Sequence, residues 1–77
     1  MNKKLIDIVS TALEISNDHI DPEKKFDEYQ NWDSMKQIMI LGMLEDEFNI
    51  TLDDDEILRM INCSTANQII ESKSNAK

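Results

Sequence analysis

The sequence predicts an all-α fold, a small bundle of three main helices and one short helix. The composition favours helix, because the 77 residues include one glycine and one proline and are rich in strong helix formers. Apolar residues recur three and four positions apart in several segments, which is the period of a helix with one buried face. A chain of this length has room for one domain, which we take as residues 1–77 with an ordered core from about 3 to 71.

The first predicted helix runs from about Lys3 to Ser16, and Asn2 can cap its start. Its apolar stripe has helical spacing and includes Leu5, Val9, Ala12 and Leu13. Residues 17–31 follow with Pro22, scattered charges and isolated apolar side chains. They predict a long loop that is pinned at a few points, and loops of this length often serve function.

The second predicted helix begins near Ser34, and the rest of the chain is organised around it. Asp33 and Ser34 are both favourable helix-starting residues. Gln37 lies three residues after Ser34, so residues 34–37 have the pattern of a capping box. This pattern predicts the start of a long helix.

Both faces of this second helix are apolar. The face expected to lie against the core holds Ile40, Leu41, Leu44 and Phe48. The opposite face holds Met35 and Met39, with Ile38 and Met43 on its flanks and Gly42 between them. A helix in so small a domain buries one side, so the second apolar face predicts a surface for a partner. The alternative is that Met35, Ile38 and Met39 pack under the long loop.

Two further helical segments complete the predicted bundle. Asp53 can cap a short helix of about Asp54 to Met60, whose acidic first turn suits the helix dipole. Ser64 or Thr65 can cap the last helix, which is expected to turn three residues inward: Ala66, Ile69 and Ile70. The tail from Ser72 is expected to be loose.

The chain is strongly acidic, with a formal net charge of −8. The acidic residues concentrate between Glu14 and Glu56, a segment with fourteen acidic residues and three lysines. This charge disfavours nucleic acid and anionic membranes as partners and favours basic protein surfaces. No apolar run approaches the roughly 18 residues needed to cross a bilayer, so no membrane insertion is expected. With a single cysteine, Cys63, and no apolar leader at the N-terminus, we expect a cytoplasmic monomer.

The segment from residue 33 to residue 50 holds a specific pattern. It reads Asp33-Ser34-Met35, then Leu41, then Leu44-Glu45-Asp46-Glu47-Phe48 and Ile50. This pattern resembles the acyl carrier protein family, which has an Asp-Ser-Leu signature at the corresponding place. Weaker similarity extends roughly from Leu5 to Ile70, and the resemblance implies the helical fold of that family.

The resemblance also implies a function. By resemblance Ser34, between Asp33 and Met35, carries 4′-phosphopantetheine through a phosphodiester, and the thiol at the end of this arm holds an acyl or aminoacyl group as a thioester. The implied partners are a phosphopantetheinyl transferase, an acyl- or aminoacyl-loading ligase, and acceptor enzymes with basic surfaces. Such a carrier catalyses nothing itself, so no catalytic residue is assigned. The predicted partner-binding surface comprises Met35, Ile38, Met39, Gly42, Glu45 and Asp46.

Some positions depart from the family pattern. Lys36 and Met39 occupy two positions that are often acidic in fatty-acid carriers. We therefore expect a specialised pathway, such as polysaccharide decoration, a secondary metabolite or D-alanine-type loading, instead of bulk lipid synthesis. Trp32 is expected to pack against the long loop, and the alternative is that it faces the phosphopantetheine arm. The alternative from another class is a non-catalytic interaction module, a helical bundle in which Ser34 is a helix cap only.

Other chemistries find little support in the sequence. His19 is the single histidine and has no ligand partners at metal-binding spacing, and the acidic run 53–56 lacks the spacing of a calcium loop. No metal site is therefore predicted. Cys63 is expected to fill space in the fold, and nothing resembles a phosphate-cradling loop or a catalytic triad.

Overall fold

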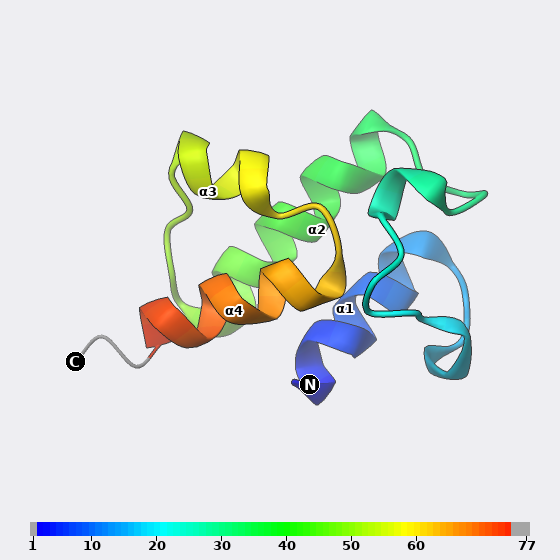
Figure 1. Ribbon diagram of the computed structural model, residues 1–77, viewed down its shortest axis with the longest axis horizontal. Coiled ribbons are helices and arrows are strands. Elements are labelled where there is room, and N and C mark those ends of the chain that lie inside the picture. The colour runs from blue at the N-terminus through cyan, green and yellow to red at the C-terminus, as the bar shows by residue number, and fades with distance from the viewer. Residues whose placement is uncertain (1, 75–77) are drawn as a thin grey trace.

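The computed structural model describes residues 2–74, and the end of the predicted loose tail, residues 75–77, lies outside the described residues. Within residues 2–74 all regular elements are helical (Figure 1). The α-helices are α1 (Lys3–Leu13), α2 (Ser34–Phe48), α3 (Asp54–Arg59) and α4 (Cys63–Ser74). Two short 3-10 helices, η1 (Asn17–His19) and η2 (Phe26–Glu28), lie in the long connection between α1 and α2. The predicted bundle of three main helices and one short helix is confirmed.

The first helix starts as predicted and ends earlier. The side chain of Asn2 accepts a hydrogen bond from the backbone N–H of Leu5 at 3.2 Å and so caps α1. The helix ends at Leu13 and not at Ser16, because Glu14 adopts the left-handed conformation with a φ of 58°. The amide of Asn31, from the far end of the long loop, donates to the carbonyl of Leu13 at 2.9 Å and fixes this end.

The second helix begins at Ser34 as predicted, but its cap is a different residue. The carboxylate of Asp33 accepts a hydrogen bond from the backbone N–H of Lys36 at 2.8 Å, so Asp33 is the N-cap. Gln37 does not reach back to the cap, since its side-chain oxygen accepts a hydrogen bond from the indole of Trp32. The capping box predicted over residues 34–37 is therefore wrong, and Ser34 is the first residue inside the helix.

The third helix matches its prediction closely. The side chain of Asp53 accepts a hydrogen bond from the backbone N–H of Glu56 and caps the helix. The side chain of Glu56 in turn accepts one from the backbone N–H of Asp53, which completes a capping box. It ends at Arg59, one residue before the expected Met60.

The fourth helix has a different cap and a later end than predicted. The side chain of Asn62 accepts a hydrogen bond from the backbone N–H of Thr65 at 2.8 Å, so neither Ser64 nor Thr65 is the cap. Residues 72–74, expected to be loose, are helical. An ion pair of 2.9 Å between Lys73 and Glu56 ties this last turn to α3, which gives a physical reason for the longer helix.

The core lies among α1, α2 and α4, with two aromatic side chains added by the long loop. Phe26 and Tyr29 are both buried, and the backbone N–H of Phe26 donates to the carbonyl of Ile61 at 2.9 Å. The prediction that this loop is pinned at a few points is confirmed. In Figure 1 the loop lies beside the N-terminal end of α2, the helix that begins at Ser34. The largest fully buried side chains include Leu5, Leu13, Ile40, Leu44, Met60 and Ile70.

Candidate functional site

Ser34 lies exposed at the N-terminal end of α2. Its hydroxyl makes no hydrogen bond to any residue in the described range 2–74, because Asp33 performs the capping. The first turn of a helix has backbone N–H groups without helical partners, and the helix dipole adds partial positive charge there. The position therefore suits a serine that carries an anionic group and that an enzyme must reach.

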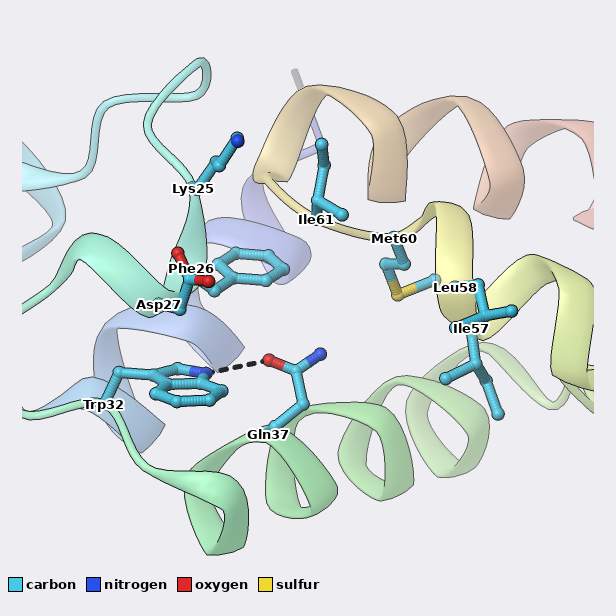
Figure 2. A pocket seen from close by; sticks show the side chains of 9 residues that line it. All are labelled: Lys25, Phe26, Asp27, Trp32, Gln37, Ile57, Leu58, Met60 and Ile61. Carbon is cyan, nitrogen blue, oxygen red and sulfur yellow. Dashed lines mark hydrogen bonds between the residues drawn. The ribbon is translucent and has the colours of Figure 1, made fainter.

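The chain on both sides of Ser34 is held by side-chain hydrogen bonds. Asp33, directly before it, bonds to the backbone N–H of Lys36. Trp32, two residues before it, donates its indole N–H to the side-chain oxygen of Gln37 at 2.9 Å (Figure 2). Ser34 is thus placed on a fixed frame while its own side chain stays free.

α2 presents apolar side chains to solvent directly after Ser34. Met35 is 71% exposed, Ile38 66% and Met39 44%. Gly42 is also exposed, and a side chain at this position would meet no atom within 4 Å. We call these four residues the α2 patch. Met43, expected on the flank of the same face, is half-buried against the core.

The acids at the far end of α2 have different surroundings. Glu45 is half-buried, and its carboxylate accepts a hydrogen bond from the backbone N–H of Leu52 at 2.9 Å. It therefore holds the α2–α3 connection, a role that the sequence did not indicate. Glu47 pairs with Lys4 at 3.0 Å. Asp46 is exposed and makes no ion pair within residues 2–74.

Lys36, which departs from the family pattern, pairs with an acid of the same chain. Its ammonium lies 2.6 Å from the carboxylate of Glu14, and the hydrogen bond and charge of Lys36 lower the pKa of the Glu14 carboxyl. The pair links the end of α1 to the first turn of α2. It also means that this lysine adds less positive charge to the surface around Ser34 than its sequence position suggests.

A cavity of about 330 Å³ lies between the start of α2, the long loop and α3 (Figure 2). Its lining includes Trp32 and Gln37 on one side and Phe26 and Met60 on the other. Trp32 is half-buried and packs against the core, which includes Phe26 and Tyr29 of the long loop. No pattern in the sequence indicates this cavity, since its lining comes from segments far apart in the chain.

Within the described residues the remaining reactive side chains do not form a second site. Cys63 is buried, and burial raises the pKa of its thiol to about 11, which keeps it protonated and unreactive at neutral pH. His19 is exposed, and its ring nitrogen Nδ1 forms a hydrogen bond with the hydroxyl of Ser16. Residues 2–74 hold no group of three or more potential metal ligands. None of the helices in this range combines the length and apolar character required to cross a membrane.

The chain is similar to known proteins over most of its length. A family model described as a phosphopantetheine attachment site matches residues 3–72. An acyl carrier protein of Chlorobium phaeobacteroides is 28% identical over 71 residues, covering 92% of this chain and 87% of the relative. Polyketide-8 synthase acyl carrier protein 1 of Streptomyces avermitilis is 35% identical over 60 residues, covering 78% and 71%. An acyl carrier protein of Nitratidesulfovibrio vulgaris is 27% identical over 73 residues, covering 95% and 96%.

Proposed function

We propose, from the premise that this chain belongs to the acyl carrier protein family, that Ser34 is the residue to which its 4′-phosphopantetheine is attached. The family match confirms the resemblance found in the sequence, and it identifies the protein as a phosphopantetheine carrier. The observation that carries the choice of Ser34 is its free, exposed hydroxyl at the start of α2, next to an Asp33 that already caps the helix. Asp33 and Met35 complete the signature around it. The shared core of residues 2–74 supports one carrier domain over residues 1–77.

In this role the protein holds a substrate and catalyses no step itself. When attached, phosphopantetheine supplies a thiol that carries an acyl group as a thioester. Ser34 anchors the arm, and the unpaired backbone N–H groups of the first turn favour the negative charge of its phosphate. Tethering then keeps the acyl group at high effective concentration near the active site of each partner.

Carriers of this family act with partner enzymes, and we assign the docking surface to the α2 patch together with Asp46. The flexible side chains of Met35 and Met39 suit a surface that accepts several partners in turn. The acidic charge of Asp46 favours enzymes with basic surfaces by speeding and orienting encounter. Glu45, predicted for the same surface, contributes less because its carboxylate is bonded to the α2–α3 connection.

The partners proposed for this surface are a phosphopantetheinyl transferase, an acyl- or aminoacyl-loading ligase and an acceptor enzyme. We place the carrier, as a monomer, in the cytoplasm, where its free thiol at Cys63 suits a reducing environment.

We further propose that the carrier serves a specialised biosynthetic pathway. Lys36 and Met39 replace acids that fatty-acid carriers often have, so negative charge is confined to the later half of α2. The relative from Streptomyces avermitilis, named for a polyketide synthase, supports a secondary-metabolite pathway over bulk lipid synthesis. Loading with candidate fatty and amino acids by the ligase of the same pathway tests this choice. Transfer of a long-chain fatty acyl group alone would contradict it.

The rival function is a passive interaction module, and the exposed α2 patch is the observation that favours it. The two functions differ in one covalent bond. We expect the apo protein, incubated with coenzyme A and a broad-range transferase, to gain the mass of one phosphopantetheine. Ser34→Ala should gain none, and Ser72→Ala, which removes an exposed serine on α4, should behave as wild type. Wild-type protein that gains no mass would favour the interaction module.

A further inference from the structure

A side-chain hydrogen bond spans the proposed attachment residue. Trp32 lies two residues before Ser34 and Gln37 three residues after it, and the indole Nε1 donates to the amide Oε1 at 2.9 Å (Figure 2). Helix capping does not explain this bond, since Asp33 fills that role. The backbone N–H of Trp32 also donates to the carbonyl of Tyr29 at 3.1 Å. Trp32 therefore connects the last turn of the long loop to the second turn of the helix.

The bond lies in a sheltered place. Trp32 and Gln37 are both half-buried on the wall of the 330 Å³ cavity, and Figure 2 shows the amide nitrogen of Gln37 directed into it. Water competes less for a hydrogen bond in such a place than for one on an open surface. An indole that is packed on its face and bonded at its N–H has little freedom to rotate. The direction in which the chain enters α2 is fixed accordingly.

We propose that Trp32 and Gln37 are a positioning pair for the transfer of phosphopantetheine to Ser34, an inference that rests on the attachment proposed above. In this transfer the Ser34 oxygen attacks the phosphorus of coenzyme A that bears the pantetheine arm. An O–P bond forms, the P–O bond to 3′,5′-ADP breaks, and the serine proton passes to a base on the transferase. Such an attack requires the oxygen to approach nearly in line with the leaving group. The pair acts by holding residues 32–34 against the helix, and it does not itself touch coenzyme A.

The test compares variants that remove or keep this one bond. Gln37→Met removes the acceptor at similar side-chain length, Trp32→Phe removes the donor and keeps an aromatic ring, and Gln37→Glu keeps an acceptor oxygen. Gln68→Met is the matched control, because Gln68 is an exposed glutamine on α4. Steady-state transfer from coenzyme A by a broad-range transferase gives kcat and KM for each carrier.

We expect Gln37→Met and Trp32→Phe each to lower kcat about five-fold, the size that loss of one ordinary hydrogen bond corresponds to. KM should stay near the wild-type value, because the α2 patch is unchanged. Gln37→Glu should retain most of the wild-type kcat, and the kcat of Gln68→Met should equal that of wild type. The double variant should be no slower than the slower single variant, since both substitutions remove the same bond.

Two results would overturn the positioning pair. One is a wild-type kcat in both single variants, even with a lowered melting temperature, since the bond would then serve the fold alone. The other is a Gln37→Glu carrier as slow as Gln37→Met. The Gln37 variants carry the test by themselves if Trp32→Phe fails to fold. Either result leaves the attachment at Ser34 standing, whereas wild-type protein that accepts no phosphopantetheine contradicts the attachment itself.

Discussion

Replacing the two residues at the start of α2 separates a capping residue from a modified one. The side chain of Asp33 accepts a hydrogen bond from the backbone N–H of Lys36 at 2.8 Å, while the hydroxyl of Ser34 makes no hydrogen bond within residues 2–74. Loss of an N-cap costs about 1 kcal/mol, within a range of about 0.5–2. For a domain of this size, a change of about 1 kcal/mol corresponds to about 4–8 °C in Tm. Asp33→Ala should therefore lower the Tm of the apo protein by several degrees.

Ser34→Ala should behave differently in the same assay. An exposed helical residue with no hydrogen bond changes stability by about 0.5 kcal/mol or less on substitution. Its Tm should therefore stay within about 4 °C of wild type. Asp33→Ser is the control that keeps a capping side chain, and it should recover most of the stability lost in Asp33→Ala. Thermal unfolding followed by circular dichroism measures all three. Equal losses in Ser34→Ala and Asp33→Ala would refute the assignment of the cap to Asp33 and would favour the interaction module.

Three further predictions concern other contacts of the fold. Glu45→Ala should lower the free energy of unfolding by about 1 kcal/mol in urea titrations, because the α2–α3 connection loses a hydrogen bond. Asp46→Ala should leave this free energy nearly unchanged. Equal effects of the two substitutions would contradict the assignment of Glu45 to the α2–α3 connection. Cys63, with a pKa raised to about 11 by burial, should resist alkylation by iodoacetamide at pH 8 in the folded protein and react after unfolding, so rapid native reaction would be inconsistent with the burial. Lys36 lowers the pKa of Glu14, so the stability from this pair is present above the unfolded pKa of about 4.5 and is lost as the pH falls through the lower folded pKa. Lys36→Met should therefore reduce Tm more at pH 7 than at pH 3. A difference in Tm that does not change with pH would argue against the ion pair.

Local signals in the sequence were sufficient to predict the helices that carry the site. The start of α2 followed from the capping preference of its first residues, and the buried positions Ile40 and Leu44 followed from helical spacing. The cap of α3 followed in the same way, because Asp53 and Glu56 satisfy each other within four residues. Features of this kind depend on neighbours in the chain, so a single sequence contains the information needed.

Features that depend on distant contacts were missed. The sequence offers Ser34 with Gln37 as a capping box as readily as Asp33, but in the fold Asp33 caps the helix and the side chain of Gln37 accepts a hydrogen bond from the indole of Trp32. The early end of α1 depends on Glu14 in a left-handed conformation, which non-glycine residues adopt infrequently. The cavity lined by Trp32 and Gln37 has walls from the long loop, α2 and α3. Helical periodicity carries no information about such long-range packing.

The attachment residue itself can be identified by peptide mass spectrometry. Protein loaded from coenzyme A is digested, and the peptides that contain Ser34, Ser64 and Ser72 are fragmented to locate the added mass. We predict phosphopantetheine on the Ser34 oxygen and on neither Ser64 nor Ser72. Its presence on a different side chain, with an unmodified Ser34, would contradict the assignment of Ser34 as the attachment residue of this carrier.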